Sequence, residues 1–282
     1  ALVDRCRSKY GSRPNVNSTS PDIRLHLFLH DSYASILSID LGNGSLHRRG
    51  LRIKDAPAPI NEVLAASILE YAEYSPRRPI YDPFCGHGTF LSEACLRAAA
   101  IPAGYFRFNQ SGESLGIFNK NMEWKAIVAE ARKMVEIRAK QLEKISKPII
   151  FGSDIDDSAV KGSKDVIGKI ASDFPHTKAL ASVNIQDALY ADLPEDILKT
   201  PGLIVTNPPY DMRIKEQNIA DLYSHFPLKL KERFPDWKLY VVSGNPEGTK
   251  AFSLRTEARI KIFNGPIECT LLSAQIMKKR EP

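Results

Sequence analysis

The chain has 282 residues, of which 43% are apolar and 26% are charged, a balance that supports a packed core and excludes disordered, collagen-like and coiled-coil proteins. No apolar run approaches the roughly 20 residues that a membrane-spanning helix needs, and the polar first residues do not resemble a signal peptide. The four cysteines are widely spaced, without a C-x-x-C pair, which argues against a disulfide scaffold or a zinc cage. We therefore expect a cytoplasmic protein with no membrane partner and no metal. The net charge of +6 mildly favours a nucleic-acid partner.

The first 44 residues differ in pattern from the rest of the chain. Residues 1–22 are polar and lack periodicity, which predicts a short helix followed by a loose leader. Residues 23–30 and 33–41 alternate between apolar and polar side chains, and they predict an antiparallel hairpin that is too small to be a domain. We therefore expect two units, residues 1–44 and residues 45–282.

Strand and helix patterns alternate through most of the second unit. Residues 60–74 show helical spacing, and residues 89–99 and 122–145 are further examples of helical stretches. Short apolar runs lie between such stretches, at residues 79–81, 149–151, 182–185, 203–205 and 239–242. This alternation predicts an α/β fold, with a mostly parallel sheet covered by helices on both faces. At the end, residues 259–263 and 267–274 flank the turn dipeptide Asn264-Gly265, which predicts an antiparallel hairpin.

Three of the predicted strands end in residues that suit a nucleotide-like cofactor. Residues 82–89 (Asp-Pro-Phe-Cys-Gly-His-Gly-Thr) open a helix, and their glycines would let backbone amides approach a ligand, although a plain turn capped by Thr89 is the alternative. After the second strand, Asp154 or Asp156 could hydrogen-bond a ribose or cap the next helix. After the third, Asp187-Ala188 could accept from an adenine amino group or form a solvated turn.

The fourth strand leads into Thr206-Asn207-Pro208-Pro209-Tyr210, which is hard to explain as an ordinary loop. Two prolines stiffen it, so the Asn207 amide oxygen and the Pro208 carbonyl can converge as acceptors beside an aromatic ring. That arrangement suits a planar base with an exocyclic amine, whose two N–H groups would be bound while Tyr210 stacks on the ring. A rigid turn with a hydrogen-bonded asparagine is the less favoured interpretation.

A basic cluster lies upstream of the predicted sheet. It contains Arg48, Arg49 and Arg52, with Lys54 close behind. These side chains could contact RNA phosphates, although a solvated surface is the commoner meaning of such a run.

Together these motifs resemble those of class I S-adenosylmethionine-dependent amino-methyltransferases. Residues 45–52, 58–65 and 263–269 narrow the resemblance to the THUMP-associated RNA guanine-N2 methyltransferases, especially the bacterial large-subunit ribosomal RNA type. The likeness covers residues 23–274. It implies a Rossmann-like methyltransferase domain at 45–282, and it implies that residues 1–44 are the last part of a THUMP-like domain.

The resemblance also implies roles for single residues. The methionine part, ribose and adenine of the cofactor would be held by Asp82, Phe84, Cys85, Gly86, Gly88, Thr89, Asp154, Ile155, Asp187 and Ala188. The target base would be held by Asn207, Pro208, Pro209 and Tyr210. The sequence departs from the family pattern at His87, where a small residue is usual, and at Asp211, where glycine is usual.

The implied reaction is methyl transfer from S-adenosylmethionine to the N2 amine of guanosine in ribosomal RNA, with S-adenosylhomocysteine as the product. A tRNA guanosine and an adenine N6 amine are the alternative targets, because the same loop serves any exocyclic amine. A binding protein that has lost turnover, or that needs a partner subunit for it, is the competing class.

Overall fold

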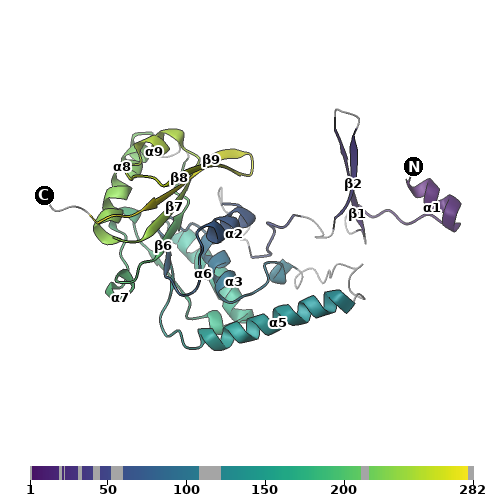
Figure 1. The fold of residues 1–282 in the computed structure, drawn as a ribbon, viewed down its shortest axis with the longest axis horizontal. Helices are drawn as coiled ribbons and strands as arrows, with labels where there is room; N and C mark the ends of the chain where they lie inside the picture. Colours follow the sequence, from purple (N-terminus) through teal and green to yellow (C-terminus); the bar gives the residue numbers. More distant parts are fainter. Residues whose placement is uncertain are drawn as a thin grey trace.

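The computed structural model describes residues 2–18, 21, 23–30, 34–40, 45–51, 60–107, 122–210 and 216–278. At the N-terminus lie helix α1 (Leu2–Tyr10) and strands β1 (Arg24–Leu29) and β2 (Ser35–Asp40). The two strands pair antiparallel, from Arg24 opposite Asp40 to Leu29 opposite Ser35, so the predicted hairpin is confirmed. Figure 1 shows the hairpin apart from the main sheet, and every residue of its two strands is exposed except Arg24 and Asp40.

The remaining strands form one seven-stranded sheet in the order β5-β4-β3-β6-β7-β9-β8. Their bounds are β3 (Ile80–Asp82), β4 (Ile150–Asp154), β5 (Ala181–Ile185), β6 (Leu203–Thr206), β7 (Lys238–Ser243), β8 (Ala258–Asn264) and β9 (Ile267–Gln275). The first five strands in that order run parallel, and β9 is antiparallel to both β7 and β8. The predicted α/β fold is therefore confirmed. The chain moves from β3 to β4 on one side and later returns to β6 on the other, which makes the ends of β3 and β6 the switch point where such sheets bind ligands.

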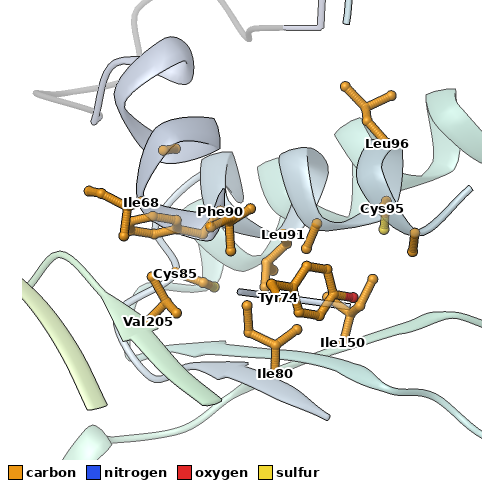
Figure 2. Close-up of a cluster of buried hydrophobic side chains, with 14 of the residues drawn as sticks. Ile68, Tyr74, Ile80, Cys85, Phe90, Leu91, Cys95, Leu96, Ile150 and Val205 are labelled. Carbon is orange, nitrogen blue, oxygen red and sulfur yellow. The ribbon is translucent and has the colours of Figure 1, made fainter. Parts of the chain in front are cut away.

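Helices cover both faces of this sheet, as Figure 1 shows. Their bounds are α2 (Glu62–Tyr71), α3 (Thr89–Ala98), α5 (Met122–Leu142), α6 (Asp157–Asp173), α7 (Glu195–Leu198), α8 (Glu216–Arg233) and α9 (Pro246–Ala251), with short 3-10 turns η1 (Pro175–Thr177) and η2 (Ala188–Tyr190). Because side chains alternate along a strand, Ile80 faces the cluster with α2, α3 and α6, whereas Tyr81 faces the cluster with α8. Figure 2 shows the first cluster, where Ile68, Phe90 and Leu91 pack over Ile80, Ile150 and Val205.

The turn of the C-terminal hairpin lies one residue later than predicted. Asn264 still pairs with Ile267, so the two turn residues are Gly265 and Pro266. Gly265 has φ +64°, and a positive φ followed by the fixed negative φ of proline suits a type II′ turn. Asn264 is therefore the last residue of β8, and its side chain is only 8% exposed.

None of the described helices is long and apolar enough to cross a membrane. All four cysteines are free thiols, as expected from their spacing. Among the residues that the structure describes, no group of three or more His, Cys, Asp or Glu side chains is arranged to hold a metal ion.

Candidate active site

The turn between β3 and α3 is held open toward the carboxyl edge of the sheet. Gly86 (φ +51°) and Gly88 (φ +79°) adopt the left-handed conformation that glycine tolerates best. A Cβ on Gly88 would lie 2.9 Å from the Ser163 Oγ of α6, so the helix packing also requires a glycine there. Gly88 is the N-cap of α3 and supplies no side-chain oxygen, so the first amides of the helix are available to an anionic group. Thr89, the alternative cap, is the first residue of the helix.

Asp154, at the end of β4, fastens this turn from the side. One carboxylate oxygen accepts from the Gly86 amide at 2.9 Å, and the other accepts from the Asp156 amide at 3.0 Å. Each oxygen has a second acceptor position, so the carboxylate can still bind hydroxyl groups. Asp156 instead caps α6 by accepting from the Ser158 amide at 2.8 Å, which resolves the choice between the two aspartates for the cap.

Asp82 joins the glycine turn to the loop after β6. Its Oδ1 accepts from the Thr206 hydroxyl at 2.6 Å and from the Phe84 amide at 3.1 Å. The side chain is buried, and burial raises the pKa of Asp82 from 3.8 to about 7, although these two hydrogen bonds oppose the shift. The negative charge of Asp154 raises this pKa further. Asp82 is thus a desolvated acceptor whose ionisation would be favoured by a positive group nearby.

The residues predicted to bind adenine lie at the ends of β4 and β5. Ile155 is 72% exposed, which leaves an apolar side chain in solvent beside Asp154. Asp187 caps η2 by accepting from the Leu189 amide at 2.9 Å, and the next residue, Ala188, is buried. A main-chain hydrogen bond joins the ends of β4 and β5, because the Gln186 amide donates to the Asp154 carbonyl at 2.9 Å.

The loop after β6 is part of a hydrogen-bond network that the sequence did not predict. The Tyr210 hydroxyl donates to Asn207 Oδ1 at 2.8 Å, and Asn264 Nδ2 donates to the Tyr210 hydroxyl at 3.3 Å. The Tyr210 ring lies close to Gly244, where a Cβ would meet its Cδ2 at 2.8 Å. Pro208 is buried and Pro209 half-buried, so the loop is packed rather than solvated. The sequence favoured Asn207 as an acceptor for a ligand over a hydrogen-bonded asparagine in a rigid turn, whereas one of its acceptor positions is already used within the loop.

The residues of the basic cluster differ in burial: Arg49 is part-buried in an ion pair, whereas Arg48 is exposed. Arg49 is part-buried, and its Nε donates to Glu93 Oε1 at 2.9 Å in an ion pair whose side chains are 11% and 5% exposed. Its guanidinium therefore stabilises the packing on α3, and the prediction that Arg49 contacts RNA phosphates gains no support. Arg48 is exposed. Arg52, Lys54 and Asp211 lie outside the described residues.

These residues fit the cofactor that the sequence predicts. An open helix N-terminus suits the carboxylate of its methionine part, the spare lone pairs of Asp154 suit ribose hydroxyls, and the exposed Ile155 side chain suits one face of adenine. The fold and the order of these strand-end motifs define a class I methyltransferase.

The family is shown by a direct match. The profile of the UPF0020 family, the RMKL-like methyltransferase domain, matches residues 49–273. The chain therefore belongs to the RMKL-like methyltransferase domain family.

Curated relatives share about a third of its residues. A provisionally named RNA methyltransferase of Synechocystis, slr0064, is 33% identical over 98% of this chain, which spans 67% of that protein. The ribosomal RNA large subunit methyltransferase K/L of Syntrophotalea carbinolica is 33% identical over 99% of this chain. The chain spans only 38% of that second relative.

Solved structures share the fold. A possible methylase from Clostridium difficile 630 superposes with a TM-score of 0.76 at 22% identity, covering 100% of this chain and 69% of that one. SMU.472, which was solved with S-adenosylhomocysteine, gives 0.74 at 20% identity, covering 100% and 69%. A protein of Listeria monocytogenes described as a predicted N6-adenine-specific DNA methylase gives 0.74 at 25% identity, covering 97% and 66%.

Proposed function

We propose that this chain transfers a methyl group from S-adenosylmethionine to the exocyclic N2 amine of guanosine in RNA, with large-subunit ribosomal RNA as the substrate. The observation that carries the proposal is the 2.6 Å hydrogen bond between Asp82 and Thr206. It fastens the residue before Asn207 to the first residue of the glycine turn, so the proposed amine acceptor and the proposed cofactor cradle belong to one rigid unit.

Within that unit each group has a separate task. The cofactor supplies a methyl group on a positively charged sulfonium. Asn207 Oδ1, through its second acceptor position, and the Pro208 carbonyl bind the two N–H groups of the target amine and aim its lone pair at the methyl carbon. As the N–C bond forms and the C–S bond breaks, the nitrogen becomes positive and its N–H donors strengthen, so these acceptors stabilise the transition state most. The extra proton then passes to water.

RNA as the substrate is supported by the relatives, whose names specify RNA or ribosomal RNA. It is also supported by the net charge of +6 and by the exposed Arg48. We propose that residues 45–282 form the methyltransferase domain and that residues 1–44 form a THUMP-like tail. The family match that begins at residue 49 and the separate, exposed β1–β2 hairpin support this division.

An adenine N6 amine is a second candidate target. The Listeria protein, described as an adenine-specific DNA methylase, favours it, and the Asn207 loop would serve that amine equally well. A tRNA guanosine, or binding of RNA without turnover, would leave the same site geometry.

The deciding experiment measures the modified nucleoside. An unmethylated transcript of large-subunit ribosomal RNA is incubated with the protein and S-adenosylmethionine. The RNA is then digested to nucleosides, which are separated by chromatography and identified by mass spectrometry. We expect N2-methylguanosine. N6-methyladenosine would move the assignment to adenine, and cofactor binding without any methylated nucleoside would favour an RNA-binding homologue.

Replacing Asn207 with Ala tests the chemistry of the loop. We expect methyl transfer to fall roughly 100-fold or more, because the lost acceptor acts mainly in the transition state, while cofactor affinity hardly changes. Single-turnover transfer to the transcript and calorimetric titration of the cofactor measure the two effects separately. An equal loss of rate and of cofactor affinity would contradict the assigned role.

A further inference from the structure

We propose that Asn264 is a positioning residue for this reaction, which acts through Tyr210 to hold the side-chain oxygen of Asn207 where the target amine can reach it. The inference rests on the proposed function, because it assigns a role to Asn207 in binding the amine. It concerns a residue that the sequence placed in a hairpin turn and that the structure places at the end of β8, beside the candidate site.

The hydrogen bonds around Asn264 have a fixed direction. The Asn61 amide can only donate, and it donates to Asn264 Oδ1 at 2.8 Å. The amide nitrogen of Asn264 must therefore point the other way, toward the Tyr210 hydroxyl at 3.3 Å. A hydroxyl that accepts there keeps its single proton for another partner. Two acceptors lie within reach, Asn207 Oδ1 at 2.8 Å and the Cys269 sulfur, and the amide oxygen is the stronger of the two.

This chain of donors decides which end of the Asn207 amide faces the Tyr210 hydroxyl. The oxygen and the nitrogen of an asparagine amide are almost equal in shape, so packing alone does not distinguish them. A hydroxyl that must donate does distinguish them, because only the oxygen can accept. With the hydroxyl free to rotate, the amide of Asn207 could turn over and present a donor to the target amine, which also donates.

Burial makes this arrangement specific. Asn264 is only 8% exposed, and the Tyr210 ring packs against the hydrophobic cluster that includes Cys269. The partners come from the N-terminus of α2, the end of β8 and the loop after β6. Burial also raises the pKa of Tyr210, of Cys269 and of Tyr223, to about 12 in the last case, so these neighbours are neutral near neutral pH.

The Asn264→Asp substitution reverses the direction of the hydrogen bond between residue 264 and the Tyr210 hydroxyl, and it leaves the shape of the side chain unchanged. A carboxylate still accepts from the Asn61 amide, but it also accepts from the Tyr210 hydroxyl and so takes that proton away from Asn207. We expect single-turnover methyl transfer to the ribosomal RNA transcript to fall at least about 10-fold at about pH 8, with calorimetric affinity for the cofactor within about twofold of the parent. Protonating the new carboxyl restores a donor, so the ratio of variant to parent rate should rise as the pH is lowered to about 6. Glu268→Gln changes an exposed charge on the same hairpin and is the matched control, which we expect to transfer methyl at the parent rate.

A second variant keeps the test valid if Asn264→Asp folds poorly. Tyr210→Phe keeps the ring and removes the hydroxyl, so it should lose rate to a similar extent, and adding Asn264→Asp to it should cost less than about a further twofold. Stacking of the ring on the base would by itself leave the hydroxyl dispensable. A parent rate for Tyr210→Phe, additive losses in the double variant, or a pH-independent rate ratio would each overturn the inference. If Asn207→Ala also transfers methyl at the parent rate, the role assigned to Asn207 fails; if only Asn207→Ala is impaired, the failure belongs to Asn264. A transcript that the parent protein itself leaves unmethylated would instead mean that the proposed function fails.

Discussion

Replacing Asp82 with Asn should stabilise the ligand-free protein at alkaline pH and weaken its hold on the cofactor. The Asp82 side chain is 2% exposed, and burial raises its pKa from 3.8 to about 7. The folded state therefore binds this proton more tightly than the unfolded chain does. The stability that this group contributes is fully present below about pH 4 and is lost as the pH rises to about 7.

The size of the effect follows from the two pKa values. A rise of about three units corresponds to about 4 kcal/mol of lost stability above pH 7. At about pH 5 only about 2 kcal/mol of that has been lost, so the cost should grow by about 2 to 3 kcal/mol between pH 5 and pH 8. An asparagine cannot ionise, and its oxygen can still accept from Thr206 and Phe84, although its extra N–H group adds a penalty that does not depend on pH.

Urea unfolding of parent and variant at about pH 5 and about pH 8, without cofactor, measures this difference directly. We expect the variant to gain about 2 to 3 kcal/mol on the parent between the two pH values. In parallel, cofactor affinity of the parent should rise with pH through about 7, since an ionised Asp82 attracts the positive cofactor, and that dependence should disappear in the variant. The same stability difference at both pH values would refute the claim that Asp82 is a buried carboxyl with a raised pKa.

Three further substitutions distinguish residues that bind a ligand from a residue that stabilises the fold. Asp154→Ala should weaken S-adenosylhomocysteine binding, measured by calorimetry, by on the order of 1 to 3 kcal/mol, because it removes a ribose acceptor and frees the Gly86 amide; unchanged affinity would exclude Asp154 from the site. Arg48→Ala should lower affinity for the RNA transcript and reduce the slope of log affinity against log salt concentration by about one unit. Arg49→Ala should mainly lower the free energy of unfolding, by about 3 kcal/mol, because it leaves the buried Glu93 carboxylate without its ion-pair partner. Equal RNA effects from the two arginines at unchanged stability would contradict this division.

The fold was predictable because its central strands, β3, β4, β6 and β7, are short, apolar and buried on both faces. The runs at 79–81 and 203–205 differ from β3 and β6 by one residue at their ends, since the last residue of each strand is polar and was assigned to the loop. Helices α6 and α8 were not among the helical stretches named from the sequence; in α8, Pro227 lies inside the helix, where proline usually signals a helix end. The hairpin turn was misplaced by one residue, because Asn-Gly is a strong turn signal and the following proline was not weighed against it.

The candidate site was only partly predictable, because local motifs do not reveal which distant residues fasten them. Ser163 donates to the Gly86 carbonyl at 2.7 Å from a helix that begins far along the chain, and no pattern near residue 86 indicates it. Asn61 could have been found as a helix cap, since an asparagine directly precedes the apolar spacing of α2. Its contact with Asn264 could not, because that pairing depends on how β8 packs against the start of the domain.

The position of Asn207 follows from the sheet rather than from the loop that contains it. Strands β3 and β6 are parallel neighbours, with Ile80 opposite Leu203 and Tyr81 opposite Ile204, so they end within a residue or two of each other. A carboxyl group at one end and a hydroxyl at the other then meet across the sheet, and their hydrogen bond fixes the residue that follows each. The glycine turn and the Asn207 loop cannot move apart without breaking a bond buried from water, which is costly for a carboxyl group. The burial of Asp82 that lowers stability at alkaline pH therefore also keeps the glycine turn and the Asn207 loop at a fixed distance from each other.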